Sequence, residues 1–204
     1  MEESDFNLNK QNIDSASRIV ASMERITQAF RVLLWQESKM YGLNPTQVQV
    51  MIFLHYHQPD MRRVSYLAAE FNLTKATISD TVKSLEQKKL IKKVSDTDDS
   101  RSYQIALTAK GKRIAAKASL FSSAIYQPIK MMPLPVQEIL LDNLLSVIEH
   151  LRNTGLVSIQ RMCTSCIYYH LAEGDKMRYC SLLGQKLKVT EIRIDCPEHL
   201  TKAE

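Results

Sequence analysis

The hydrophobic positions of residues 15–40 repeat with the period of an α-helix. This stretch contains neither Pro nor Gly, and its apolar residues follow one another at spacings of four, three, four and three: Ile19, Met23, Ile26, Phe30 and Leu33. The pattern predicts one long helix with a single apolar stripe, which is typical of a core or of a dimer seam. Residues 1–14 are acidic and polar at their start, and we expect them to form a flexible N-terminus.

Three shorter helical patterns follow. Asn44 and Pro45 suit the cap and the first position of a helix. Residues 64–71 and 75–89 then place apolar side chains at the helical period, with a short turn between them. Two helices joined so tightly predict a helix-turn-helix over residues 64–89.

The pattern then changes to that of β-strands. Residues 90–94 and 102–107 are short apolar segments separated by the polar loop SDTDDSR, which predicts a hairpin over residues 91–107 with a charged tip. A hairpin directly after a helix-turn-helix is a winged helix. Two further helices are expected, from residue 108 to about 126 and from 136 to about 152, and prolines interrupt the chain between them.

The last of these helices has a wide apolar surface. Five apolar residues lie on one face and three more widen it: Val136, Leu140, Leu144, Val147, Leu151, Leu141, Leu145 and Ile148. Such a face is typical of burial between partners. We therefore expect a mainly α (α+β) fold, with a winged helix-turn-helix and long dimerisation helices over residues 15–152. Residues 153–155 stop the last helix, and residues 153–204 form a small separate module.

Composition and charge narrow the class of protein. Apolar residues make up 45% of the 204 residues and charged residues 24%, as in folded soluble proteins. We see neither a secretory signal nor an apolar run of the ~20 residues that span a bilayer, so we expect a cytoplasmic protein without a membrane partner. The net charge is +5, and residues 61–113 carry twelve Lys or Arg against six Asp or Glu. This excess favours a polyanionic partner, with a solvated charged surface as the alternative.

All four cysteines lie in the C-terminal module: Cys163, Cys166, Cys180 and Cys196. The first two form a Cys-x2-Cys pair, whose sulfurs can meet one metal in a tight turn, and two further thiolates complete the ligand set. In a reducing compartment this group predicts one metal centre per chain rather than structural disulfides. A redox disulfide pair and unligated cysteines are the alternatives.

The spacing bears on which metal is bound. Most zinc ribbons use two Cys-x2-Cys pairs, whereas the last two cysteines here stand alone and a Pro follows the last. This resembles small iron–sulfur modules, including high-potential iron–sulfur proteins, so an iron–sulfur cluster is slightly favoured over zinc. Tyr168, Tyr169 and Tyr179 can shield a cluster or form the module's small core, and His170 and His199 are weaker candidate ligands. Metal binding and folding should be coupled in so small a unit.

Two stretches resemble the MarR family of bacterial transcriptional regulators, within a likeness that covers roughly residues 15–152. LTKATISDTVKSLEQKKLI is similar to the family's recognition helix and the start of its wing. DTDDSRSYQIALTAKG is similar to the wing signature, which it matches at six positions: Asp96, Asp99, Arg101, Leu107, Thr108 and Gly111. Thr97 and Ser100 replace the usual Pro and the first wing Arg, and Lys89 stands where the family has a Gly. A left-handed backbone at Lys89 would cost about 1 kcal/mol.

The resemblance implies a homodimer on double-stranded DNA with a pseudo-palindromic operator. If the apolar residues of 75–89 point inward, six others face the major groove: Lys75, Ala76, Thr77, Ser79, Asp80 and Lys83. Four basic residues are expected mostly at phosphates: Lys75, Lys83, Arg62 and Arg63. Arg101 is the candidate for the minor groove, and a salt bridge to Asp96 or Asp99 is its alternative role.

The sequence thus predicts a DNA-binding transcriptional regulator, and no enzyme. Its four-cysteine module is a candidate sensor of metal, iron–sulfur status or oxidant. The alternatives are a regulator that answers an unknown small-molecule inducer and keeps a structural zinc, or a metal-stabilised protein-interaction adaptor. A thioredoxin-like redox enzyme is disfavoured because no βαβ unit surrounds the Cys-x2-Cys pair, and we find no phosphate-binding Gly-rich loop.

Overall fold

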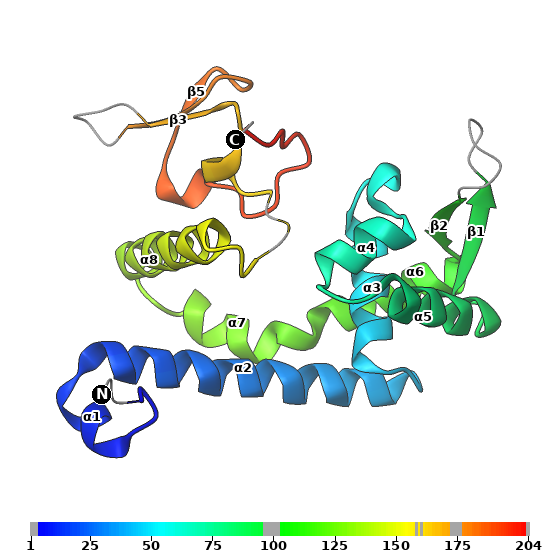
Figure 1. Ribbon diagram of the computed structural model, residues 1–204, viewed down its shortest axis with the longest axis horizontal. Coiled ribbons are helices and arrows are strands. Elements are labelled where there is room, and N and C mark those ends of the chain that lie inside the picture. The colour runs from blue at the N-terminus through cyan, green and yellow to red at the C-terminus, as the bar shows by residue number, and fades with distance from the viewer. Residues whose placement is uncertain (1–3, 96–102, 158, 160, 172–176, 203–204) are drawn as a thin grey trace.

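The structure is a computed structural model that describes residues 4–202, except 96–102, 158, 160 and 172–176. Figure 1 shows a long helix, α2 (Ser15–Met40), beneath a winged helix at one end and helix α8 (Leu134–Asn153) at the other. A small unit with its own sheet packs on α8. The fold is mainly helical, as the sequence predicted, and the described residues form two small sheets, of which only the two-stranded hairpin was predicted.

Helix α2 has the bounds that its apolar period predicted. Asp14 caps it, since its side chain accepts hydrogen bonds from two backbone N–H groups of the first turn. The segment before it differs from the flexible terminus that we expected, because Leu8–Ile13 forms a short helix, α1. Asp5 anchors this segment by accepting a hydrogen bond from the hydroxyl of buried Ser17 at 3.0 Å.

The winged helix confirms the predicted order of helices and strands. Its elements are α3 (Pro45–Tyr56), η1 (Pro59–Met61), α4 (Val64–Glu70), α5 (Lys75–Gln87), β1 (Ile91–Ser95), β2 (Tyr103–Leu107) and α6 (Ala109–Ala118). Strands β1 and β2 pair antiparallel, with Ile91 opposite Leu107. The apolar faces of the helices and of the hairpin meet in one core, whose most deeply buried members include Val50, Leu54, Leu67, Ile78, Leu85 and Ile105. This core holds α5 with its apolar face inward.

The turn from α5 into the wing is left-handed, as the sequence suggested. Lys89 has a φ of 57°. Its N–H donates to the carbonyl of Glu86, and the N–H of Leu90 donates to the carbonyl of Leu85. These two bonds form a Schellman motif, which sets the direction in which the chain leaves the helix. Lysine disfavours a left-handed backbone, and Lys89 adopts this conformation because the two hydrogen bonds impose it.

The Leu-Thr-x-x-Gly stretch has a packing explanation. Thr108 caps α6, since its hydroxyl accepts the N–H of Gly111 at 3.1 Å, and its own N–H donates to the carbonyl of Leu90 at 3.0 Å. A Cβ on Gly111 would lie 2.0 Å from that same carbonyl oxygen. The first turn of α6 therefore approaches the backbone at the base of the wing too closely for any side chain.

The helix expected from residue 108 to 126 is interrupted. Residues Ser119–Ser122 form a 3-10 turn, η2, between α6 and α7 (Ser123–Lys130). The hydroxyls of Ser119 and Ser123 donate to the carbonyls of residues three positions earlier, which competes with α-helical bonding. Pro128 lies inside α7, and the break between α7 and α8 comes only after Lys130.

Helix α8 has two apolar sides. Leu145 is buried and, with half-buried Leu141 and Ile148, packs against the C-terminal unit. Other apolar residues of α8 are exposed on the single chain: Leu134, Val136, Ile139, Leu144 and Val147. The wide apolar surface predicted from the sequence is therefore divided between an internal contact and an open face.

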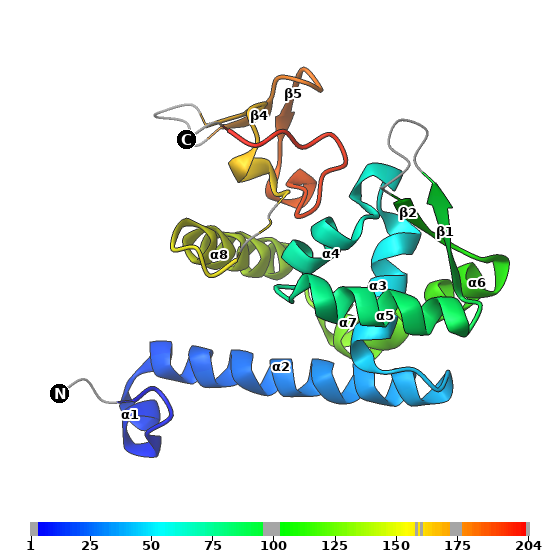
Figure 2. The ribbon, with the colours of Figure 1, turned by 45° about the vertical axis from the view of Figure 1, so that its right-hand side comes forward.

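The C-terminal unit, residues 161–202, is called the cysteine module below. It contains β3 (Tyr169–Leu171), β4 (Arg178–Cys180) and β5 (Gln185–Leu187), which form one antiparallel sheet in that order, and the short turns η3 (Cys163–Ser165) and η4 (Val189–Glu191). Figure 2 shows the module above α8 and beside α4. Among the described residues, no helix is long and apolar enough to cross a membrane.

Candidate nucleic-acid interface and thiol cavity

The outer face of α5 is polar and exposed. The helix buries Ile78, Val82 and Leu85, which turns the other positions outward. All six residues proposed for base or phosphate contacts are exposed: Lys75, Ala76, Thr77, Ser79, Asp80 and Lys83. Thr74 caps the helix by accepting the N–H of Thr77 at 3.1 Å. The first turn thus carries small side chains and a lysine, which a DNA groove can accommodate.

The arginines expected at phosphates have different surroundings. Arg62 donates through Nε to the carbonyl of His57 at 2.8 Å, and burial lowers the pKa of Arg62. This side chain therefore braces the turn after α3. Arg63 is half-buried at the start of α4. Arg101, the predicted wing residue, lies outside the described residues, as do Asp96 and Asp99.

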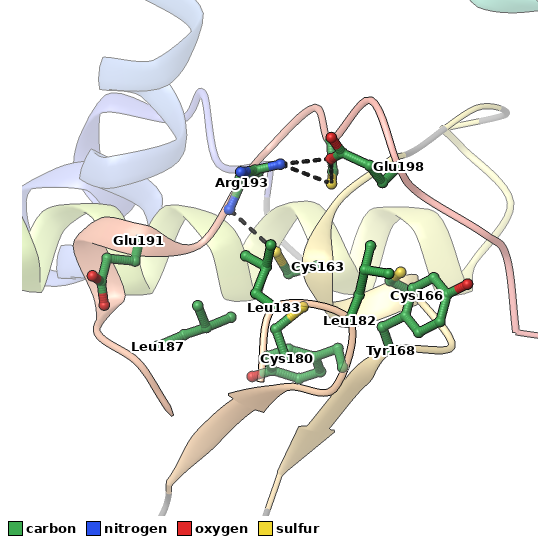
Figure 3. A pocket seen from close by; sticks show the side chains of 12 residues that line it. Cys163, Cys166, Tyr168, Cys180, Leu182, Leu183, Leu187, Glu191, Arg193 and Glu198 are labelled. Atoms are coloured by element: carbon green, nitrogen blue, oxygen red, sulfur yellow. Dashed lines mark hydrogen bonds and ion pairs between the residues drawn. The ribbon is translucent and has the colours of Figure 1, made fainter. Parts of the chain in front are cut away.

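The four cysteines surround one cavity in the cysteine module. Cys163 and Cys166 come from the η3 turn, where the N–H of Cys166 donates to the carbonyl of Cys163 at 2.9 Å. Cys180 ends β4, and Cys196 lies in the loop after η4. All four line a cavity of about 30 Å³, which Figure 3 shows from close by. The structure therefore brings together residues that are up to 33 positions apart in the chain.

Hydrogen bonds from one arginine reach two of the sulfurs. The backbone N–H of Arg193 donates to Sγ of Cys163 at 3.3 Å, and its Nη1 donates to Sγ of Cys196 at 3.5 Å. Nη1 also donates to Glu198 at 2.7 Å. Burial raises the pKa of the Cys163 thiol, and the N–H of Arg193 partly offsets this. Electropositive donors at the sulfurs favour the thiolate form that metals bind.

The aromatic and histidine predictions can now be placed. Tyr168 and Tyr169 line the cavity, whereas Tyr179, next to Cys180, is not among its lining residues. His199 faces the hydroxyl of Ser165 at 2.9 Å, and His170 faces that of Ser181 at 3.3 Å. Neither histidine lines the cavity.

A buried arginine joins the cysteine module to the helix-turn-helix. Arg161 is 8% exposed and lies two residues before Cys163. Its guanidinium donates to Glu70 of α4 at 2.8 Å, to the hydroxyl of Tyr66 of α4 at 2.7 Å, and to Asp195 at 2.5 Å. Asp195 directly precedes Cys196, the last of the four cysteines, just as Arg161 lies shortly before the first. The bond between Arg161 and Asp195 therefore joins the two ends of the segment that forms the cavity.

The charged residues around Arg161, called the Arg161 group below, stabilise one another in their charged forms. Burial alone would raise the pKa of Asp195, but hydrogen bonds from Arg161 and His57 lower it on balance. The bond to Asp195 is in turn the main reason that the pKa of Arg161 is raised. His57 stacks on Phe53 at 3.7 Å and approaches Asp195 at 2.7 Å. The contact thus reaches α3 as well as α4.

Sequence reasoning missed this group. His57, Arg161 and Glu70 belong to no motif. The available signal was weak: an arginine shortly before the first cysteine and an aspartate immediately before the last. Nothing in the sequence indicates that both meet α4.

Comparisons with known proteins agree with this architecture. A family model described as "MarR family" matches residues 41–102, from directly after α2 into the wing. Over these residues the chain is similar to that family. The match covers less than a third of the 204 residues. No curated protein matches the chain.

Solved structures resemble about two thirds of this chain. Staphylococcus aureus MepR in a complex with DNA has a TM-score of 0.55 at 23% identity, over 64% of this chain and 96% of MepR. MepR in a DNA-binding conformation has a TM-score of 0.56 at 23% identity, over 65% and 98%. A MarR family regulator from Rhodococcus sp. RHA1 has a TM-score of 0.52 at 20% identity, over 66% and 96%. These similarities show the fold, and about a third of this chain lies outside them.

Proposed function

We propose that this chain is a transcriptional regulator that binds double-stranded DNA as a homodimer. The observation that carries the proposal is the outer face of α5. Its small polar residues and lysines are exposed on a helix whose other side is fixed in the core, next to a two-stranded wing. A rigid helix with this face is suited to a major groove, and its N-terminus favours a nearby phosphate.

The second subunit is argued from apolar surface. Helix α2 exposes Ile19, Ile26, Phe30 and Trp35, and the open face of α8 adds Val136 and Val147. Apolar surface on two long helices is typical of a subunit interface, and a second copy of the chain is its proposed occupant. A twofold dimer would present two α5 helices to the duplex, so we expect a pseudo-palindromic operator.

The comparisons support DNA as the partner. MepR, which shares the fold, has been solved in a complex with DNA and is named as a transcription regulator of a multidrug efflux pump. At 23% identity this likeness does not carry over its operator or its target gene. The operator of this chain should instead be selected from random duplexes.

The test is a fluorescence-anisotropy titration on a selected operator at several salt concentrations. The double variant Lys75→Gln/Lys83→Gln should weaken binding by tenfold or more and make the salt dependence shallower, because each lost phosphate contact lowers the slope by about one. The matched control Lys186→Gln/Lys188→Gln removes the same charge from the cysteine module. Equal affinities and slopes for the wild type and the α5 variant would sink the proposal.

The wing adds a second DNA prediction. Arg101→Ala should weaken operator binding by more than about tenfold, or 1.4 kcal/mol, while leaving the dimer intact. Sedimentation checks the dimer, and the same anisotropy titration measures the affinity. Unchanged affinity would remove the wing from the mechanism.

A second function, metal-dependent control of DNA binding, is favoured by the Arg161 contact. The cysteine module would bind one metal centre through its four thiolates. Arg161 and Asp195 flank the ligands and bind each other, and Arg161 also binds Glu70 of α4. Occupancy of the centre can therefore change how the helix-turn-helix is held. The module also packs on α8, so it touches both the DNA-binding helices and the proposed dimer helix. This arrangement favours sensing over a purely structural metal or an adaptor role.

The test compares operator affinity with and without bound metal. A sensor should show an affinity change of several-fold or more on metal loading, and Arg161→Met should remove that change while leaving metal content intact. A metal-independent affinity would favour the alternative, in which an unidentified small molecule is the inducer and the metal only stabilises the module.

A further inference from the structure

The arrangement of the thiols is too open for a single ion. A zinc ion binds sulfur at about 2.3 Å, which brings four sulfurs to within about 3.8 Å of one another. Among the described residues, which include all four cysteines, no three His, Cys, Asp or Glu side chains gather closely enough to hold one ion. The thiols instead line a cavity of about 30 Å³, whereas one water needs only about 10–15 Å³. The four sulfurs thus surround a space larger than one atom.

The walls of the cavity are mostly apolar. Leu182, Leu183, Leu187 and Tyr168 line the cavity around the cysteines, as Figure 3 shows. Glu198 also reaches the lining, where it accepts a hydrogen bond from Arg193 at 2.7 Å. A cluster with inorganic sulfide needs such a shell, because exclusion of water protects its bridging sulfides and shifts its potential.

Hydrogen-bond donors near the sulfurs also suit an iron–sulfur cluster. The N–H of Arg193 donates to the sulfur of Cys163 and its guanidinium donates to that of Cys196, and hydrogen bonds of this kind stabilise the thiolates that hold a cluster. Four thiolates around a [4Fe–4S]²⁺ core leave a net negative charge, and Arg193 supplies a compensating positive charge next to one ligand.

We infer that the metal centre of the proposed regulator is a cubane [4Fe–4S] cluster held by Cys163, Cys166, Cys180 and Cys196. On assembly from two ferric ions, two ferrous ions and four sulfides, each thiol releases its proton to solvent and each sulfur forms a bond to a different iron, so that no electron is gained or lost. Cys196 then no longer donates to Glu198, a contact of 3.3 Å in the thiol form, and Glu198 keeps its bond to Arg193. The inference rests on the metal centre proposed above and does not depend on DNA binding.

The experiment uses the full-length protein purified without oxygen. We expect a broad visible absorption band and about four irons and four acid-labile sulfides per chain. The metal-free protein is also incubated in parallel with equal amounts of ferric and ferrous iron plus sulfide, and with zinc alone. Restoration of the band and of this stoichiometry by iron and sulfide supports the cluster. One zinc per chain without sulfide, or a failure to take up iron and sulfide, would overturn it.

Variants assign the ligands. Cys180→Ser and Cys196→Ser should each lower the iron content after reconstitution by more than about tenfold. Ser181→Ala is the matched control, because it lies next to Cys180 and is exposed. Far-ultraviolet circular dichroism checks that the winged helix of each variant stays folded. Unchanged iron and sulfide content in both cysteine variants would show that the cluster, if any, is bound elsewhere.

The same samples separate this inference from the proposed function. A protein that carries the cluster but binds no operator contradicts the regulator and leaves the cluster standing. A protein that binds the operator and takes up only zinc contradicts the cluster and leaves the regulator standing.

Discussion

The winged helix and the cysteine module reach a folded state by different means. Among the described residues, the winged-helix core contains eighteen buried apolar residues from α2 to α6, the hairpin and the turns between them, which favours folding by burial alone. Within the described part of the module, the core contains seven buried residues, of which two are cysteines and one belongs to α8. We therefore expect the module to depend on its proposed metal centre and on its packing against α8, and the winged helix to depend on neither.

The two parts also differ in how charge is used. On α5 the lysines are exposed, where charges contribute little to stability and are available to a polyanion. At the module the key arginine is buried between two carboxylates and joins the parts together. The basic residues of this chain thus have two different environments: those on α5 are exposed, as the proposed DNA recognition requires, and Arg161 is buried where the two parts meet.

Removal of the proposed metal centre should have the largest effect on stability, and this effect should be confined to the cysteine module. Apparent binding energies of structural metal sites are on the order of 10 kcal/mol, and in a small module this energy is folding energy. After anaerobic chelation we expect hydrogen exchange in residues 161–195 to speed up at least about a hundredfold, while amides of α3 and α5 change little. Equal protection of the module with and without metal would abolish the contrast between the two parts.

A cavity in the winged-helix core should be the next largest effect. Leu54 is 1% exposed in the core, so Leu54→Ala should lower the free energy of unfolding by about 2–5 kcal/mol. Leu120→Ala, at a residue that is 67% exposed, should change it by less than about 0.5 kcal/mol. Chemical denaturation followed by circular dichroism measures both, and metal content should not change in either variant. A loss of metal in Leu54→Ala would mean that the two parts fold as one.

Breaking the contact between the parts should cost somewhat less. Arg161→Met leaves Glu70 and Asp195 without their shared partner, and removal of one member of a buried ion pair costs about 3 kcal/mol or more. Asp195 is partly exposed, so we expect the lower end of that range. Arg178→Met, which breaks the half-exposed pair with Asp142, is the control and should cost about 1 kcal/mol or less. A double-mutant cycle with Glu70→Gln isolates the coupling, and additive effects would contradict a direct link.

Acid should weaken the same contact. The pKa of Asp195 is lowered in the folded protein, so its contribution to stability is present above the carboxyl's unfolded pKa of about 4 and is lost as the pH falls through the lower folded value. We expect exchange at the α4 contact to increase below about pH 4 in the wild type and to be less pH-dependent in Asp195→Asn. The same pH dependence in both proteins would assign the effect to another group.

Much of the winged helix could be predicted because its signals are local. Apolar periods gave α2, α4 and α5, and cap residues such as Asn44 and Thr108 marked where helices begin. The break at Ser119–Ser122 was missed because the serine hydroxyls compete with the helix only weakly, and tertiary packing decides the outcome. The short helix α1 was missed for a similar reason, since it depends on the bond from Ser17 to Asp5.

The candidate sites also differ in whether a short stretch of sequence is enough to predict them. The helical period alone placed the outward face of α5, and the cysteine spacing alone predicted a shared site. The Arg161 group could not be found in this way, because Glu70, Arg161 and Asp195 come from three separate segments. Their meeting is a consequence of how the module packs on α4, which no short-range pattern encodes.

The smallest predicted effect tests the backbone strain at the end of α5. Lys89 holds a φ of 57° at the end of α5, a conformation that Gly adopts without strain. We expect Lys89→Gly to raise the free energy of unfolding by up to about 1 kcal/mol, reduced by the greater freedom of Gly in the unfolded chain. Gln87→Gly is the matched control, because it is exposed in the last helical turn and should lose about 0.5–1 kcal/mol.

The two substitutions add the same residue two positions apart and should act in opposite directions. Thermal and chemical denaturation measure the sign, and operator binding should be unaffected by the relief of strain alone. If Lys89→Gly instead destabilised the protein, the strain would not be what distinguishes this position. The lysine side chain would then contribute more to the winged helix than its exposed position indicates.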